Sequence, residues 1–104
     1  MTNFRHTSPS ADRWLDEAVM CTTLLSGRYR DELGDLLNRT RRLLSASAPN
    51  DSGRQLILAA ARRTVTQIDK KLVSLISQAP EDGPALVHAH TACDRLLACL
   101  SHDA

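Results

Sequence analysis

The sequence predicts an all-α fold, a small antiparallel helical bundle of three to four helices. Apolar residues recur at steps of three and four along nearly the whole chain, and no alternating run is long enough for a convincing strand. Short loops join the long amphipathic segments, which favours antiparallel neighbours. A chain of 104 residues has room for one domain with one core. We expect a mobile N-terminal tail at residues 1–8 and a single helical bundle domain at residues 9–104.

The first helix is expected to begin at Pro9 with Ser8 as its N-cap, because proline is tolerated at the first helical position. Glycine lowers helix stability by about 1 kcal/mol relative to alanine, so Ser26 and Gly27 form a weak point. The sequence leaves open whether the helix breaks or bends there. Its apolar stripe follows steps of four, three and four and consists of Trp14, Ala18, Cys21 and Leu25.

A second helical segment, RYRDELGDLLNRTRRLLSAS, comes next, and its apolar stripe holds Tyr29, Leu33, Leu36, Leu37, Leu43 and Leu44. The interruption ASAPNDSG ends it, because the residue before Pro49 is pushed out of the α region. The residues from Ser52 to Gln55 have the S-x-x-Q form of a capping box. Ser52 is therefore expected to open the next helix.

The third helix, roughly residues 53–78, carries a heptad seam of Leu58, Ala61, Val65, Ile68, Leu72 and Leu75. The turn formers APEDGP follow, with Asp82 or Gly83 as a cap and Pro84 in the first turn of a fourth helix. This fourth helix is expected to reach about residue 101 and to bury Leu86, Ala89, Cys93, Leu96 or Leu97, and Leu100.

The charges nearly cancel at +1, which argues against a global field for nucleic acid or an anionic membrane. Residues 28–71 nevertheless carry a local excess of +5. Nucleic acid is disfavoured as a partner, because there is no helix-turn-helix spacing and the chain has only three aromatic residues for stacking. A solvated basic face is the preferred interpretation of the five arginines Arg39, Arg41, Arg42, Arg62 and Arg63.

The N-terminus shows no apolar signal segment, and no run of eighteen apolar residues suggests a membrane span. We therefore expect a cytoplasmic protein without a membrane partner. The three cysteines, Cys21, Cys93 and Cys99, include no CxxC pair and are interpreted as reduced core thiols.

The segment HAHTACDRLLACLSH is rich in histidine and cysteine, so it raises the question of a metal site. On a regular helix His88 and His90 point about 200° apart and cannot chelate one ion together. His90, Cys93 and Asp94 do share a face, yet zinc sites favour three or four converging nitrogen or sulfur ligands, usually from two elements. We expect no metal and no other cofactor, while metal binding by this helix stays open as an alternative.

Catalysis is not indicated either. The sequence has no glycine-rich phosphate loop, no nucleophile elbow and no carboxylate pair that its spacing forces into a pocket. We predict that the protein is not an enzyme, and we assign no catalytic or cofactor-binding residues.

A resemblance to a known family rests on three stretches: Trp14 and Leu15 with Met20 about a turn later, SGRYRDELGDLLNRTRRLL, and VTQIDKKLVSLI. Over about residues 14–76 the chain resembles the small cytoplasmic export chaperones of flagellar and type III secretion systems, in particular the flagellar filament-cap chaperone family. The resemblance implies a cytoplasmic helical chaperone whose last helix masks or contributes to the partner groove.

The expected function is therefore non-enzymatic: a protein-binding helical module, a secretion or export chaperone or adaptor that holds an amphipathic helix of a partner. The alternative is a small dimeric helical regulator that binds nucleic acid or a small ligand. Adjacent apolar pairs widen each stripe, so surplus apolar surface predicts a homodimer when the protein is alone. The candidate partner-binding residues are Leu36, Leu43, Leu86, Leu97 and Leu100.

Overall fold

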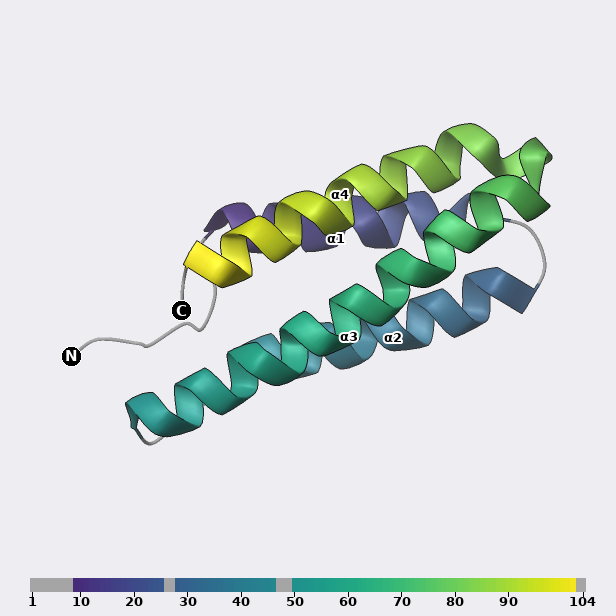
Figure 1. Cartoon of the computed structure of the whole chain (residues 1–104). Helices are drawn as coiled ribbons and strands as arrows, with labels where there is room; N and C mark the ends of the chain where they lie inside the picture. Colours follow the sequence, from purple (N-terminus) through teal and green to yellow (C-terminus); the bar gives the residue numbers. More distant parts are fainter. Residues whose placement is uncertain (1–8, 26–27, 47–49, 103–104) are drawn as a thin grey trace.

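The computed structural model describes residues 9–25, 28–46 and 50–102. Its elements are α1 (Pro9–Thr23), α2 (Arg28–Ser45), α3 (Asp51–Gln78), the 3₁₀ turn η1 (Pro80–Asp82) and α4 (Gly83–His102). The helices run alternately up and down the long axis of the molecule (Figure 1). No strand occurs among these described residues, so the predicted all-α antiparallel bundle is confirmed and its helices number four.

Helix α3 is the longest element, and it packs along both α2 and α4 (Figure 1). Helix α1 packs chiefly along α4 and less extensively along α2. The result is an elongated molecule of 48 × 19 × 18 Å. One continuous core lies between the four helices.

The predicted heptad seam of α3 is confirmed, because each of its side chains is at most 2% exposed: Leu58, Ala61, Val65, Ile68, Leu72 and Leu75. The facing side of α4 buries Leu86, Ala89, Ala92, Cys93, Leu96 and Leu100. Of the pair that the sequence left open, Leu96 is in the core and Leu97 packs at its edge. The 3.6-residue period therefore identified the inward faces of both helices.

The structure resolves the relation between the first two helices. After Thr23 the backbone N–H groups of Leu24 and Leu25 donate to the carbonyls of Cys21 and Thr22, a tighter i→i+3 pattern that closes α1. Helix α2 then begins separately at Arg28. Ser26 and Gly27 themselves lie outside the described residues, as do Ser8 and the tail at residues 1–8.

The predicted capping box at Ser52 is wrong, since α3 begins earlier, at Asp51. Its N-cap is Asn50, which has an extended backbone, and its side-chain oxygen accepts a 2.8 Å hydrogen bond from the N–H of Gly53. Asn50 satisfies one of the free N–H groups of the first turn, and Ser52 is already helical. At the other side of this loop α2 ends at Ser45, while Pro49 lies outside the described residues.

The inner face of α1 differs in one residue from the predicted stripe. Ala18, Cys21 and Leu25 are buried as expected, but Trp14 is only partly buried. The guanidinium groups of Arg13 and Arg95 each lie 5.0 Å from the centre of its ring. Trp14 therefore packs at the edge of the core, where its ring attracts cations from both α1 and α4.

The stripe predicted for α2 divides between core and edge. Leu33, Leu37 and Leu44 are at most 5% exposed, whereas Tyr29, Leu36 and Leu43 are partly buried against the core. In each adjacent leucine pair of α2 one member is therefore in the core and the other lies at its rim, as a 100° step between neighbours requires.

Three threonines are buried in this otherwise apolar core, namely Thr22, Thr40 and Thr64. Each hydroxyl donates to a carbonyl one turn earlier in its own helix, at 2.8–3.0 Å. Their polar groups are therefore satisfied without a partner helix, as buried hydroxyls must be. None of the described helices combines the length and apolar character that crossing a membrane requires.

Replacement of Ile68 tests the seam. Ile68 is 0% exposed in the middle of α3, so Ile68→Ala should lower the free energy of unfolding by about 2–5 kcal/mol through lost burial and a residual cavity. Urea denaturation followed by circular dichroism measures this loss. The control is Val73→Ala on the same helix, where the side chain is 49% exposed and the change should be small. Equal effects of the two substitutions would contradict the register of α3 described above.

Candidate functional site

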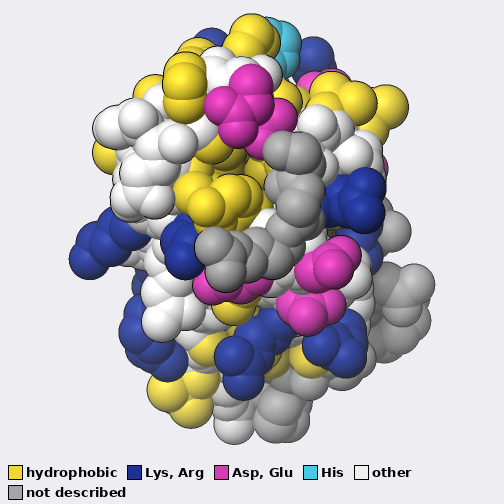
Figure 2. All heavy atoms as spheres, turned by 90° about the vertical axis from the view of Figure 1, so that its right-hand side faces the viewer, with side chains coloured by type: hydrophobic (Ala, Val, Ile, Leu, Met, Phe, Trp, Pro, Cys, Tyr) yellow, Lys and Arg dark blue, Asp and Glu magenta, His cyan; other side chains and the backbone are white. Residues whose placement is uncertain are grey.

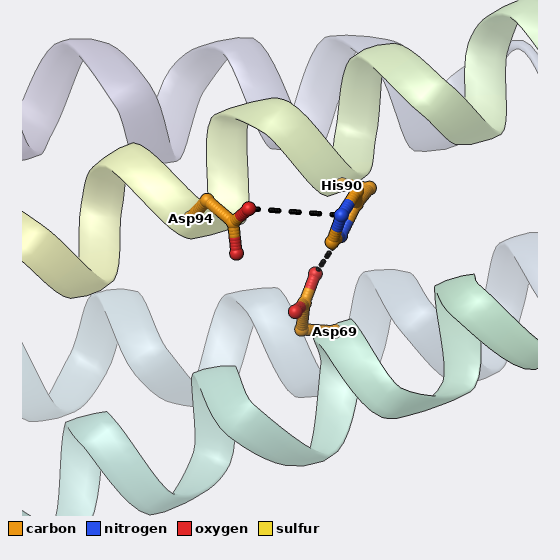
Figure 3. A group of neighbouring side chains, drawn as sticks. All are labelled: Asp69, His90 and Asp94. Carbon is orange, nitrogen blue, oxygen red and sulfur yellow. Dashed lines mark hydrogen bonds and ion pairs between the residues drawn. The ribbon is translucent and has the colours of Figure 1, made fainter.

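A polar cluster of Asp69, His90 and Asp94 spans the contact between α3 and α4 (Figure 3). The Nδ1 atom of His90 lies 2.5 Å from Oδ1 of Asp69 on α3. Its other ring nitrogen, Nε2, lies 3.6 Å from Oδ2 of Asp94, one turn further along α4. One imidazole thus has a carboxylate at each of its two nitrogens, one on the neighbouring helix and one on its own.

Each member of the polar cluster follows a buried residue in the sequence, which explains its position. Asp69 follows Ile68 of the α3 seam, and its side chain is only 19% exposed. His90 and Asp94 follow Ala89 and Cys93 of the α4 core face. Neighbours on a helix are about 100° apart, so all three side chains emerge at the border of the α3–α4 contact rather than on the fully solvated faces.

The electrostatics of the cluster favour a protonated imidazole. The hydrogen bond with Asp69 raises the pKa of His90 above its ordinary value of 6.5, partial burial opposes this, and the negative charges of Asp69 and Asp94 add to the increase. An imidazolium has an N–H at both nitrogens, and here each N–H faces a carboxylate. The charged form of His90 therefore strengthens the α3–α4 contact.

Cys93 does not join this cluster, although the helical wheel places it on one face with His90 and Asp94. Its side chain is 0% exposed and points into the core. Burial, together with the nearby carboxylates, raises the pKa of its thiol to about 12, so the thiol stays neutral. Burial and the charge of Glu17 also raise the pKa of Cys21. Among the described residues, the one group of three possible ligand side chains is Asp69, His90 and Asp94.

Sequence reasoning found two of the three members and missed Asp69. His90 and Asp94 share a face by their i, i+4 spacing, which needs no tertiary information. Asp69 lies 21 positions earlier, and it meets His90 only because α3 and α4 pack in a particular register. The available signal was a carboxylate directly beside a seam residue, which indicates a half-buried acid in need of a partner.

A second feature is an apolar hollow at the end of the bundle where α1 finishes and α4 begins. Its volume is about 350 Å³, and its walls are formed by Cys21, Leu24, Glu81, Asp82, Pro84, Ala85 and His88. Leu24 is 72% exposed, and Met20, one turn earlier in α1, is 66% exposed. Figure 2 faces this end and shows hydrophobic side chains at the surface beside acidic ones. The walls of the hollow are thus mainly apolar, and Glu81 and Asp82 add two acidic groups to them.

The predicted partner-binding leucines are not gathered at this hollow. The structure places Leu86 and Leu100 in the core at 1% and 0% exposure, so they present no surface to a partner in this conformation. Leu36, Leu43 and Leu97 are partly buried against the core. Leu36, Leu43 and Leu97 are the rim members of adjacent apolar pairs, whereas Leu86 and Leu100 belong to the buried stripe of α4.

Among the residues that the structure describes, five large apolar side chains are exposed, and none of them is a predicted partner-binding residue: Met20, Leu24, Leu56, Val73 and Val87. An apolar residue on the polar side of a wheel was the signal for them.

Comparison with models of known protein families, with curated proteins and with solved structures finds no match. The resemblance to export chaperones therefore stays a prediction, and the polar cluster and the apolar hollow are the structural features that bear on function.

The interaction of His90 with its carboxylates predicts a pH-dependent stability in metal-free protein. Because the folded-state pKa of His90 is raised, its stabilising effect is fully present below the ordinary pKa of 6.5 and is lost as pH rises through the folded-state pKa. The loss of unfolding free energy in His90→Gln should therefore be larger at about pH 5.5 than at about pH 9.

Chemical denaturation in the presence of a chelator, at both pH values, measures this difference. His88→Gln is the matched control, because His88 is exposed on the same helix and lies at the apolar hollow rather than in the polar cluster. A His90→Gln effect that is independent of pH would mean that the ion pair makes no contribution.

Proposed function

We propose that the protein is a non-enzymatic helical module that binds another protein, with the apolar hollow as the place where it holds an amphipathic helix. The observation that carries this proposal is the hollow between α1 and α4, with Leu24 72% exposed on its wall. Scattered surface leucines are normal in soluble proteins. A concave, mainly apolar site with an exposed leucine on its wall is typical of a site for an apolar anchor of a partner.

The charges around the hollow favour a partner with basic residues. Glu81 and Asp82 line it, and Glu17 is close enough to Cys21 for its charge to act on the thiol. A helix that places an apolar side chain in the hollow and flanks it with lysine or arginine would be complementary in both respects. An acidic helix of the same shape would meet like charges.

A cytoplasmic export chaperone or adaptor is the specific version that we propose, because the resemblance in residues 14–76 implies it. Helix α4 contributes Pro84, Ala85 and His88 to the hollow, in agreement with a groove partly built by the last helix. When no partner is present, the exposed Met20 and Leu24 favour self-association of two copies through the same end.

A peptide-binding experiment tests the proposal. The probes are two fluorescent model helices with the same leucine face, one with lysine and one with glutamate on the polar face. We expect the full-length protein to bind the lysine peptide more tightly than the glutamate peptide in fluorescence anisotropy. Leu24→Asn should weaken binding of the lysine peptide by about tenfold or more, because it removes an apolar wall.

Leu56→Asn is the control for this substitution, because Leu56 is 71% exposed near the start of α3, at the opposite end of the bundle. It should leave peptide binding unchanged, and circular dichroism verifies the fold of both variants. Equal binding by the two variants, or no binding of either peptide, would contradict the proposed site. Tight binding of double-stranded DNA instead would favour a regulator that uses the basic side chains of α2 and α3.

Sedimentation equilibrium tests self-association separately. We expect the wild-type protein to dimerise with increasing concentration and Leu24→Asn to shift it toward the monomer, because a polar side chain removes part of the shared apolar surface. Leu56→Asn should dimerise as the wild type does. A wild-type protein that stays monomeric at all concentrations would exclude the dimer.

A further inference from the structure

We propose that Nε2 of His90 and the carboxylate of Asp94 bind a divalent cation of the zinc class, with Asp69 as a positioning residue for the imidazole. This inference concerns the polar cluster and does not depend on the apolar hollow. It rests on three observations: the distance between the two ligand atoms, the carboxylate of Asp69 at Nδ1 of the imidazole, and the increase in side-chain exposure from Asp69 to Asp94.

The distance between the two ligand atoms fits a bound cation better than a direct hydrogen bond. Nε2 of His90 and Oδ2 of Asp94 are 3.6 Å apart, which is beyond the usual range of N–H···O hydrogen bonds. Zinc binds imidazole nitrogen and carboxylate oxygen at about 2.0–2.2 Å, so two ligands on a tetrahedral ion are separated by about 3.4 Å. An ion can therefore bridge the two atoms with little movement of either side chain.

The contact with Asp69 sets which nitrogen is available. An ionised carboxylate only accepts hydrogen bonds, so Asp69 favours the neutral tautomer with the proton on Nδ1 and the lone pair on Nε2, the nitrogen that faces Asp94. Histidine ligands of metals commonly donate their second N–H to a carboxylate in this way, which fixes the ring and makes the ligating nitrogen more basic. Asp69 thus provides the orientation without contacting the ion.

The exposed fraction of the side chain increases from Asp69 through His90 to Asp94. The side chain of Asp69 is 19% exposed, that of His90 33% and that of Asp94 57%. The positioning carboxylate is therefore the most shielded member, and the ligating carboxylate is open to water, which can fill the remaining coordination positions. One nitrogen and one oxygen ligand suit zinc and its neighbours, whereas calcium and magnesium prefer all-oxygen sites.

The spacing on α4 supplies both ligands from one rigid element. His90 and Asp94 are one turn apart, and residues at i and i+4 lie on the same face. Since Asp69 belongs to α3, an ion at Nε2 also strengthens the contact that ties the two helices together. The buried seam closes the bundle without an ion, so the fold is expected to persist when a chelator is present.

Calorimetric titration of chelator-treated full-length protein with zinc chloride tests the proposal. We expect one cation per chain in the wild type and in His88→Asn, whose imidazole lies outside the polar cluster. Asp94→Asn and His90→Asn should weaken binding by about tenfold or more, and Asp69→Asn by about 10- to 100-fold, because it releases the ring. Asp94 is more than half exposed, so its variant stays informative if His90→Asn fails to fold.

A long-range ¹H–¹⁵N spectrum of the imidazoles locates the ion independently of affinity. Zinc should shift Nε2 of His90 while Nδ1 keeps its proton, and in Asp69→Asn this tautomer preference should be reduced. A purely structural Asp69 would leave the tautomer signal of His90 unchanged once folding is verified. Zinc affinity that is unchanged in Asp94→Asn, shifts confined to other histidines, or no binding below about 1 mM zinc would overturn the proposal.

Discussion

Burial of the α3 seam is the interaction on which the arrangement of the other helices depends. Helix α3 packs along both α2 and α4, and its inward side chains are almost completely removed from water. Helix α1 is held in turn by α4 rather than by α3. A one-residue change in the register of α3 would therefore alter its packing against both α2 and α4. It would also separate Asp69 from His90.

The fold could be predicted from the sequence because apolar residues recur with the same helical period in each of its α-helices. Steps of three and four located the seam of α3 and the inner face of α4, including the buried Leu58 and Cys93. Helix boundaries were less accessible, since Asn50 and Ser52 are both good N-cap residues and only the backbone conformation decides between them. Trp14 shows a further limit, because its size and two nearby guanidinium groups keep it at the rim.

The two candidate sites differ in what the sequence reveals about them. The pair of His90 and Asp94 follows from spacing within one helix, whereas Asp69 is added by the packing of another. The apolar hollow could not be predicted from one helix at all, because it forms where the end of α1 meets the start of α4. Leu86 and Leu100 follow the helical periodicity of α4 and are core residues. Leu24 is exposed and does not belong to the apolar stripe of α1. The periodicity of apolar residues within a helix indicates which side chains are buried. Residues of a binding surface often do not follow this periodicity.

The pairing of α1 with α4 has a consequence for synthesis of the chain. The inner face of α1, including Leu15 and Ala18, is covered mainly by α4, which the ribosome makes after α2 and α3. Contacts between α2 and α3 are closer in sequence and can form first, while α1 must wait until α4 has been made. During that interval the apolar face of α1 lacks most of its cover, and transiently exposed apolar surface of this kind promotes aggregation in competition with folding.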